Sequence, residues 1–254
     1  NSFAFLICMQ IKKAKELLKT IKRIRPKILV IGDVMLDEYI HGIVERISPE
    51  APVPILNFSK KEKILGGAGN VVSNLVNLGA KTDLATIIGD DQEGRELNLL
   101  LQKNNISCEL IISSKNVNTT KKTRFLCDSK QLFRLDKDSN GFSENDYIRI
   151  EKKINSVLKK YDCIILSDYN KGVFSDSFTK NIIKYGNTLK IPVYIDPKGD
   201  NWNKYYGATV ITPNITEVEN ELKIKLRTDS DFEKAALKIK ENFNLGSCLC
   251  LLYT

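Results

Sequence analysis

The sequence predicts an α/β fold in which helices cover both faces of a mostly parallel central sheet, with a small β lid added at one edge. Short buried strands alternate with amphipathic helices along most of the chain, a pattern typical of right-handed crossovers between parallel strands. Two β segments, at residues 39–58 and 118–136, interrupt the alternation and predict a small extra sheet that is a lid, a dimer clasp or both. With 254 residues, 42% of them hydrophobic, the chain can bury a substantial core as one domain.

We divide the chain into an N-terminal extension with a helix, residues 1–26, and an α/β domain, residues 27–254. Residues 11–24 form a predicted basic amphipathic helix, which Pro26 ends. The apolar first eight residues lack the basic region and cleavage site of a secretory leader and are too short to cross a bilayer, and Met9 is a more natural start. We therefore expect no targeting or membrane segment, no membrane partner and a cytoplasmic location.

A glycine cluster, Leu65-Gly66-Gly67-Ala68-Gly69-Asn70, comes directly before an amphipathic helix predicted over residues 71–79. Glycines without a Cβ let a ligand reach the backbone, and free N–H groups at a helix start suit an oxygen-rich ligand. The Asn70 amide can both donate and accept hydrogen bonds. The alternative is an ordinary glycine turn before a packed helix.

The remaining elements follow from periodicity and from capping and turn residues. A capping box is predicted at Asp90–Glu93. Strands are expected at 27–33, 82–88, 162–167, 191–195 and 208–211, lid strands at 39–44, 52–58, 118–127 and 131–136, and helices at 94–104, 143–160, from 175, from 215 and at 230–243.

Polar side chains follow several of the predicted parallel strands. Because the carboxyl ends of parallel strands share one edge of a sheet, we expect these side chains to form a ligand site. They are Asp33 and Asp37, Asp168 with Lys171, Asp196 with Lys198, and Asn214 with Glu217. Lysines pair with phosphate, and carboxylates hold hydrated magnesium together with nucleotide phosphates. For Asp33, a turn or capping role is the alternative.

The composition favours a metabolic protein over a nucleic-acid binder. The formal net charge is +8, but the lysines are interspersed with acidic and amide residues, and neither zinc-finger spacing nor an aromatic RNA-binding strand occurs. We interpret the charge as a solvated basic surface that attracts anionic metabolites. Six cysteines without a C-x-x-C pair indicate buried, reduced thiols in a cytosolic protein.

Several motifs resemble those of one family. Residues 31–37 (IGDVMLD), 66–70 (GGAGN) and 214–217 (NITE) are similar to the ribokinase-like (PfkB) sugar kinases. Residues 46–54 (RISPEAPVP), 131–136 (QLFRLD), 166–172 (LSDYNKG) and 195–199 (IDPKG) resemble the kinase domain of the heptose 7-phosphate kinases. In many bacteria that domain is fused to an adenylyltransferase. The resemblance covers residues 27–245 and rests on several separate motifs.

The resemblance implies a ribokinase-like fold and ATP-dependent, Mg²⁺-assisted phosphorylation of D-glycero-β-D-manno-heptose 7-phosphate at C1, a step toward ADP-heptose and the lipopolysaccharide core. It also implies a homodimer formed through the lid. Its implied site residues are Asp33, Asp37, Gly66, Gly67 and Asn70 for the sugar, Arg134 and Lys171 for the sugar's phosphate, Lys198, Asn214 and Glu217 for the nucleotide phosphates, and Glu217 and Asp196 for magnesium.

One departure concerns the catalytic base. In the family this base is an aspartate in a D-T-x-G-A-G-D segment, which also forms an anion hole, and no such segment occurs in the 254 residues. The residues after Leu245 also match the family poorly. We therefore expect a C-terminally truncated kinase with no catalytic residue of its own and no activity alone, whose base would lie downstream of Thr254. The single His41 lies in a predicted lid strand, and we interpret it as structural rather than as a substitute base.

Other functions stay open at this point. A dinucleotide-binding oxidoreductase would use Gly67-Ala68-Gly69, but Val72 replaces the third glycine of G-x-G-x-x-G. A P-loop enzyme is excluded because G-x-x-x-x-G-K-[ST] does not occur. A kinase of another sugar, and a non-catalytic remnant that binds a sugar phosphate or dimerises, are the remaining alternatives.

Overall fold

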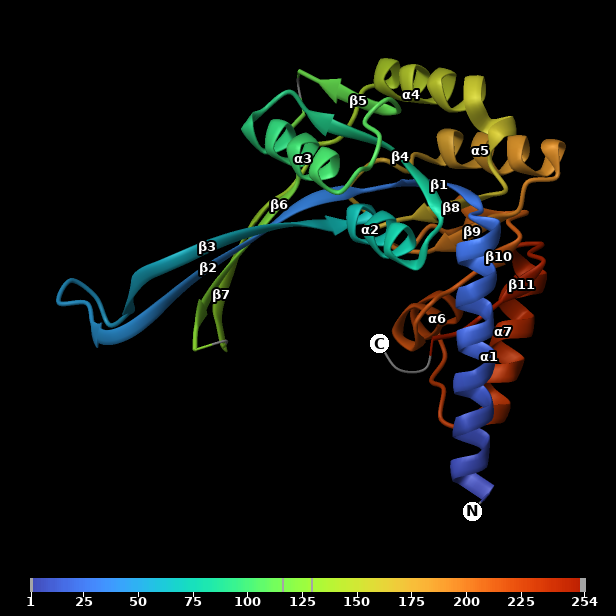
Figure 1. The fold of residues 1–254 in the computed structure, drawn as a ribbon, viewed down its shortest axis with the longest axis horizontal. Coiled ribbons are helices and arrows are strands. Elements are labelled where there is room, and N and C mark those ends of the chain that lie inside the picture. The colour runs from blue at the N-terminus through green and yellow to red at the C-terminus, as the bar shows by residue number, and fades with distance from the viewer. Residues whose placement is uncertain (1, 116, 129, 252–254) are drawn as a thin grey trace.

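The central sheet is parallel throughout. The computed structural model describes residues 2–115, 117–128 and 130–251. Within them the strand order is β11-β10-β9-β8-β1-β4-β5 (Figure 1). These strands are β1 (Lys27–Gly32), β4 (Lys81–Gly89), β5 (Ile111–Ser114), β8 (Cys163–Ser167), β9 (Val193–Asp196), β10 (Val210–Ile211) and β11 (Ser247–Cys248). The predicted parallel α/β sheet is confirmed.

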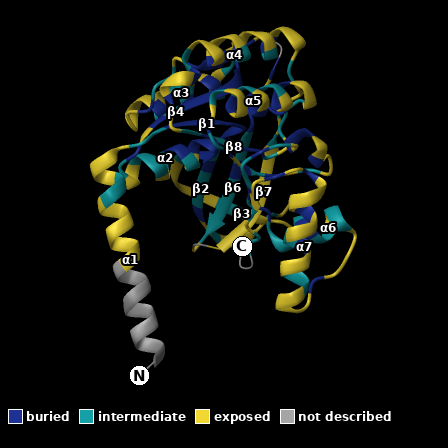
Figure 2. Cartoon of the chain, turned by 90° about the vertical axis from the view of Figure 1, so that its right-hand side faces the viewer, coloured by how far each residue is buried: buried dark blue, intermediate teal, exposed yellow. Residues whose placement is uncertain are grey.

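Helices cover both faces of this sheet, as predicted. The α-helices are α1 (Ser2–Ile24), α2 (Ala68–Leu78), α3 (Gln92–Lys103), α4 (Glu144–Val157), α5 (Asp176–Leu189), α6 (Ile215–Leu222) and α7 (Asp229–Asn242), with 3₁₀ turns η1 (Leu158–Lys160) and η2 (Trp202–Tyr205). Strand β1 is buried on both sides, because Ile28 and Val30 pack toward α2 and α3 while Leu29 and Ile31 pack toward α4 and α5. Figure 2 shows the buried strands between these helices.

A second sheet forms the predicted lid and projects from the body (Figure 1). Its order is β3-β2-β6-β7, with β2 (Val34–Ile47), β3 (Pro54–Gly67), β6 (Lys121–Cys127) and β7 (Lys130–Lys137). Strand β2 is antiparallel to β3 and parallel to β6. The strands β2 and β3 are much longer than predicted, because β2 begins directly after Asp33 and β3 runs back to Gly67, so the hairpin grows out of the central domain.

The glycine cluster joins the lid to a helix. Gly66 and Gly67 end β3, and α2 begins at Ala68 rather than at Val71 as predicted. Gly67 has φ 57°, and the Ala68 amide donates to the Asp33 carbonyl at 2.9 Å, so the helix starts where a long-range contact fixes the chain. The helix ends, as predicted, at Gly79, whose φ of 100° is left-handed.

Three smaller expectations are corrected. The cap of α3 is Asp91, whose carboxylate accepts from the Gly94 amide, so the capping motif lies one residue later than predicted. Strand β10 is two residues long, half the predicted length. The described cysteines, Cys108, Cys127, Cys163, Cys248 and Cys250, are free as expected, but each is half-buried rather than buried. Cys8 lies outside the residues whose side chains are described.

Within the described part of the chain, no helix is both long and apolar enough to cross a membrane.

Helix α4 offers a direct test of the core. Ile154 lies on the inner face of this helix and is fully buried, whereas Ile148 on the same helix is 58% exposed. Ile154→Ala removes buried methyl groups and leaves a cavity, so we expect it to lower the unfolding free energy by about 2–5 kcal/mol. Ile148→Ala, the matched control, should change it by less than about 0.5 kcal/mol. Urea denaturation followed by circular dichroism measures both, and equal losses would contradict this packing.

Candidate functional site

The carboxylate of Asp33 holds the loop that follows β8. One oxygen accepts from the Tyr169 and Lys171 amides at 2.8 and 3.1 Å, and the other accepts from the Val173 amide at 3.0 Å. The side chain is 2% exposed. Burial, reinforced by the charge of Asp168, raises the pKa of Asp33 to about 6, and the three amide bonds oppose the rise. This is the capping alternative considered for Asp33, and its contact with a sugar stays a prediction.

A second buried carboxylate, Asp168, lies at the end of β8. It accepts from the Lys204 ammonium at 2.6 Å and from the Tyr205 hydroxyl at 2.7 Å. Lys204 is 6% exposed, so the pair is almost wholly removed from water. Removing one member of such a pair leaves an uncompensated buried charge. Asp168 is therefore bound to η2, whereas Lys171, the other polar residue expected at this strand end, pairs with Asp138.

Asp37 lies on β2, on the lid face that carries several charged groups. Its carboxylate accepts from the Arg124 guanidinium at 2.8 Å. Arg124 also lies over the Tyr39 ring, with 5.2 Å to its centroid. A Cβ on Gly66 would collide with the Asp37 carboxylate, so the glycine makes room for this carboxylate. Sequence reasoning gave Gly66 the different task of exposing backbone to a ligand, which stays a prediction.

The two residues expected at the sugar's phosphate come from different elements. Arg134 on β7 lies directly opposite Arg124 on β6, so the two share the lid face of Asp37. Arg134 also makes a bidentate pair with Asp136, at 2.7 and 2.9 Å. Lys171 lies in the loop held by Asp33, and its ammonium is 2.8 Å from Asp138. Asn70 is exposed in the first turn of α2.

The residues expected on the nucleotide side do come together. Lys198, Asn214 and Glu217 line one open hollow of about 960 Å³, and Lys171 lies at the same hollow. Asn214 caps α6. Its side-chain oxygen accepts from the backbone amide of Glu217, and its backbone amide donates to the Glu217 carboxylate, both at 2.9 Å. The Lys198 ammonium is 2.7 Å from the other Glu217 oxygen. The N-x-x-E motif is thus a capping box whose carboxylate also faces the hollow.

Asp196, at the end of β9, completes this side of the site. Burial, with the nearby charge of Glu217, raises the pKa of Asp196 to about 6. A cation would relieve the repulsion between these two carboxylates, and magnesium is commonly held by one or two carboxylates plus phosphate oxygens. The pair therefore fits magnesium. Among the described residues there is no group of three or more His, Cys, Asp or Glu side chains that could hold a metal.

Tyr169 connects the two sides of the site. Burial raises the pKa of its hydroxyl first, and the charges of Asp196 and Asp37 raise it further. A single phenol therefore lies within electrostatic reach of both Asp37 and Asp196. Asp196 and Lys198 lie at the carboxyl edge of the sheet, whereas Asp37 and Arg134 lie on the lid strands β2 and β7.

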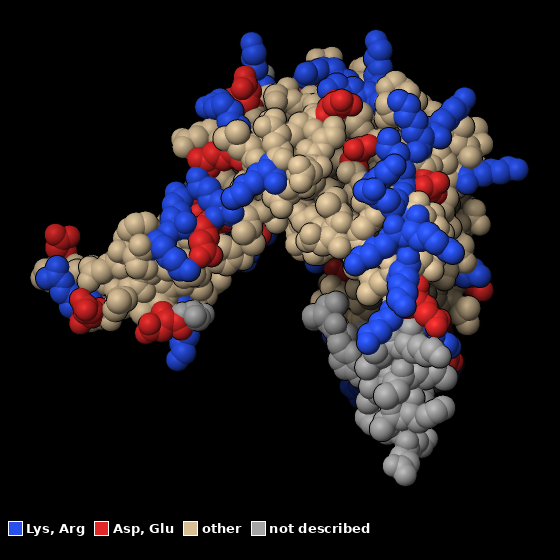
Figure 3. All heavy atoms as spheres, in the orientation of Figure 1, with Lys and Arg blue, Asp and Glu red and all other residues tan. Residues whose placement is uncertain are grey.

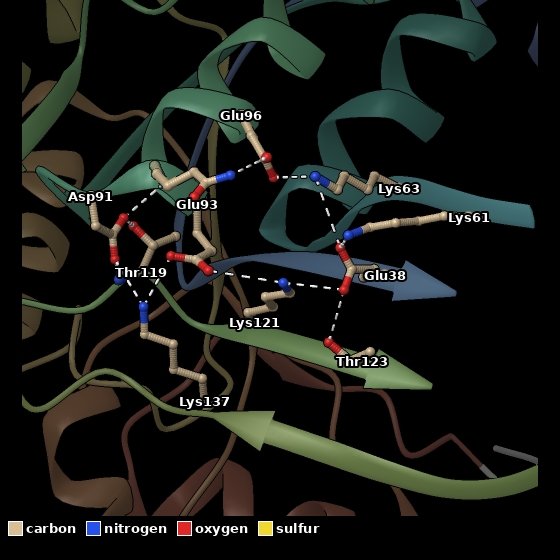
Figure 4. A network of polar contacts seen from close by, with 12 residues as sticks. Glu38, Lys61, Lys63, Asp91, Glu93, Glu96, Thr119, Lys121, Thr123 and Lys137 are labelled. Atoms are coloured by element: carbon tan, nitrogen blue, oxygen red, sulfur yellow. Dashed lines mark hydrogen bonds and ion pairs between the residues drawn. The ribbon is translucent and has the colours of Figure 1, made fainter. Parts of the chain in front are cut away.

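On its other face the lid is bound to α3 through a charged network (Figure 4). Glu38, 2% exposed, lies among three lysines: Lys61 at 2.6 Å, Lys121 at 3.1 Å and Lys63 at 3.8 Å. Lys63 also contacts Glu96 of α3. Burial works to raise the pKa of Glu38, but the lysines outweigh it and lower the pKa. This network orients the lid on the body.

Sequence reasoning missed Arg124 and Lys204. Arg124 lies two residues after Lys122, the residue directly opposite Asp37, and therefore shares the face of Asp37. This placement follows from the strand register, which the sequence does not show. Lys204 lies in η2 and gave no sequence signal. His41 lies in β2, the expected lid location, with its side chain 3.8 Å from Glu62.

The end of the chain bears on the expected catalytic base. The base was expected downstream of Thr254, and Thr254 lies outside the described residues, which end at Leu251. The location of the base therefore stays a prediction. The last described residue lies beside Asn214, because the Leu251 amide donates to the Pro213 carbonyl at 2.8 Å.

Comparison with known proteins shows the family of this chain. The profile of a family described as pfkB family carbohydrate kinase matches residues 25–245. The chain belongs to this family. It is 41% identical over 238 residues to the bifunctional protein HldE of Sulfurimonas denitrificans, a match that covers 92% of this chain and 50% of that protein. The chain thus spans about half the length of the curated relatives it matches.

Solved structures share the pfkB fold with this chain. Phosphofructokinase-2 from Escherichia coli, in complex with fructose-6-phosphate, superposes with a TM-score of 0.72 at 17% identity, over 89% of this chain and 74% of that one. Arabidopsis thaliana ribokinase, complexed with ribose and ATP, gives a TM-score of 0.67 at 17% identity, over 89% and 71%. These likenesses confirm the predicted ribokinase-like fold.

The raised pKa of Asp33 makes a testable contribution to stability. Between its ordinary value of 3.8 and about 6, folded Asp33 keeps a proton that the unfolded chain has released. Its favourable contribution is therefore full below about pH 4 and is lost as the pH rises through about 6, by up to roughly 3 kcal/mol.

The asparagine side chain in Asp33→Asn cannot ionise, so this variant lacks the pH-dependent contribution of Asp33. We therefore expect the loss of unfolding free energy to be larger at about pH 4 than at about pH 7. Urea denaturation at intermediate pH values measures the difference from the unmodified chain. Asp200→Asn, a change at an exposed carboxylate, is the control. A cost of Asp33→Asn that grows with pH would show that Asp33 is ionised at low pH in the folded chain.

Proposed function

We propose that this chain carries the sugar-phosphate site of an ATP-dependent kinase that phosphorylates D-glycero-β-D-manno-heptose 7-phosphate at C1. Membership of the pfkB family supports a carbohydrate kinase, and the identity to bifunctional HldE proteins supports a heptose substrate. The observation that carries the proposal is the lid face of Asp37. There Arg124 and Arg134 lie side by side next to a carboxylate suited to sugar hydroxyls, and a substrate with its own phosphate would use both cations.

In this proposal the two sides of Tyr169 hold the two substrates. Asp37 and Asn70 would bind sugar hydroxyls, with Gly66 and Gly67 giving access to the backbone. Lys171 and Arg134 would bind the phosphate already on the sugar. Phosphoryl transfer depends mainly on positioning and on neutralising charge, which this set of residues can supply.

The nucleotide would lie in the hollow beside α6. Lys198 faces that hollow and would pair with an ATP phosphate as a point charge, while Asn214 would keep Glu217 oriented. Asp196 and Glu217 would hold magnesium, which supplies neutralisation of the phosphate charge when bound. The sequence contains no D-T-x-G-A-G-D segment, so we propose that residues 1–254 alone bind the sugar phosphate without transferring a phosphoryl group.

Calorimetric titration with the two sugars tests the substrate class. We expect heptose 7-phosphate to bind more tightly than the unphosphorylated heptose, and Arg134→Gln to weaken only the phosphorylated sugar, by about tenfold or more, because a charge-assisted contact to phosphate is lost. Lys130→Gln, on the same exposed strand, is the matched control. Equal binding of both sugars would favour a kinase of another sugar.

Asp37→Ala should weaken both sugars if this carboxylate binds hydroxyls. An added coupled assay for ADP separates binding from turnover. Heptose-dependent ADP formation by the 254-residue chain, abolished by Asp37→Ala, would overturn the proposal that it lacks a base. Unaltered affinity for both sugars in Asp37→Ala would remove Asp37 from the site.

We propose further that the chain forms a homodimer through the lid. Large apolar side chains are exposed on the lid strands, including Phe58 (66%), Leu135 (60%) and Phe133 (53%). Such a face in water favours pairing with a second copy, and a two-fold contact would cover the same residues on both chains.

Sedimentation analysis of lid variants tests the dimer. Phe58→Ser with Leu135→Ser should convert the dimer to a monomer at micromolar concentration, because the contact loses buried apolar area. Leu237→Ser on α7 is the matched control, since Leu237 is 58% exposed and its helix contacts β11 and α6 rather than the lid. A monomeric unmodified chain, or a dimer that both variants leave intact, would contradict the lid interface.

A further inference from the structure

Helix α1 lies largely apart from the body of the protein. Figures 1 and 2 show it leaving the central domain at its C-terminal end and extending away from it. Every side chain from Lys13 to Lys19 is exposed, and only Thr20 and Ile21 are half-buried before the helix ends. A helix held at one end has little tertiary packing to stabilise it, so its exposed surface calls for a partner.

The positive charge of the chain is concentrated on this helix. Residues 12–25 contain seven Lys and Arg and one Glu, which leaves 32 basic and 30 acidic residues in the rest of the chain. Six of the eight net positive charges therefore lie on α1 and the residue after it. Figure 3 shows Lys and Arg crowded along this part of the surface. The sequence-based interpretation that the lysines are interspersed with acidic and amide residues does not hold for this segment.

Apolar side chains form a stripe opposite this charge. Ala14, Leu17, Leu18, Ile21 and Ile24 recur at the spacing of one helical face. Leu17 is 62% exposed and Ile24 is 63% exposed, so most of the stripe faces water. The lysines and arginines occupy the remaining arc. Separation of a basic arc from an exposed leucine and isoleucine stripe is characteristic of helices that lie in a membrane interface.

We propose that α1 docks this protein on the surface of an anionic lipid bilayer, with the Leu17–Ile24 stripe in the interface and the basic arc against the lipid headgroups. Each basic side chain near an anionic membrane adds attraction, and the stripe adds apolar burial. The helix lies on the bilayer and does not span it, in keeping with the absence of a membrane-spanning helix in the described residues. The proposal departs from the sequence-based expectation of no membrane partner, and it does not depend on the sugar-kinase proposal.

Two other occupants fit the surface less well. A second copy of α1 would bring six net positive charges against six, which opposes helix pairing. A nucleic acid would match the charge, but its phosphates would leave Leu17 and Ile24 in water, because charge neutralisation rewards only the basic arc. An anionic bilayer satisfies both faces of the helix at once.

Flotation with lipid vesicles tests the proposal on the whole chain. We expect binding to phosphatidylcholine vesicles that contain about one third phosphatidylglycerol, little binding to pure phosphatidylcholine, and weaker binding as salt is added. Lys13→Gln, Lys15→Gln and Lys19→Gln together should reduce the apparent affinity by at least about tenfold. The triple change Lys234→Gln, Lys238→Gln and Lys240→Gln on α7 removes the same charge from another helix and should have little effect.

The apolar stripe needs its own variant, because charge alone would also bind nucleic acid. Leu17→Asn with Leu18→Asn keeps the charge and should reduce vesicle binding by about tenfold or more. Leu237→Asn on α7 is the control, since Leu237 is 58% exposed. Circular dichroism checks that each variant keeps its fold.

Three results would overturn the proposal. The first is equal binding to neutral and anionic vesicles. The second is tight binding to duplex DNA or RNA that Leu17→Asn with Leu18→Asn leaves unchanged while vesicle binding is absent. The third is a loss of oligomerisation in the same double variant without any vesicle binding. The second result would assign α1 to nucleic acid, and the third would assign it to an interface between copies.

Discussion

The buried carboxylate of Asp33 is the interaction on which the site depends. It follows β1, an interior strand of the sheet, and accepts the backbone amides of Tyr169, Lys171 and Val173. The same residue's carbonyl accepts the first amide of α2. One aspartate thus joins the β8 loop to the start of the glycine-cluster helix. Burial removes the Asp33 carboxylate from water and raises its pKa, so this contact carries a desolvation cost.

From that junction the charged groups divide into two sets with different tasks. In the pair of Asp168 with Lys204, and in the contacts of Glu38 with its lysines, the carboxylate is buried, and these groups hold elements together. Asp37 with Arg124, and Glu217 with Lys198, are more open pairs on surfaces where a ligand can approach. The exposure of the carboxylate separates the two sets. A desolvated pair resists separation, whereas a partly solvated pair can exchange a partner for a ligand group.

The lid shows why one residue type can serve both tasks on a single strand. Along β2, Asp37 and Glu38 are consecutive, so the pleat turns them to opposite faces of the lid. Asp37 meets Arg124 on one face, and Glu38 meets Lys61 and Lys121 on the other, beside α3. A shift of one residue in register would exchange the two carboxylates and place the anchoring one on the open face.

The sequence by itself determined the fold class, the two lid segments and the polar strand ends, because hydrophobic periodicity and turn chemistry are local properties that act over a few residues. The Gly79 helix end was readable for the same reason. Only the tertiary structure decided that Asp33 binds a loop some 136 residues away, that Arg124 reaches Asp37, and that Lys204 lies against Asp168. Those pairings depend on strand order and register, which bring distant residues together and leave no periodic trace in the chain.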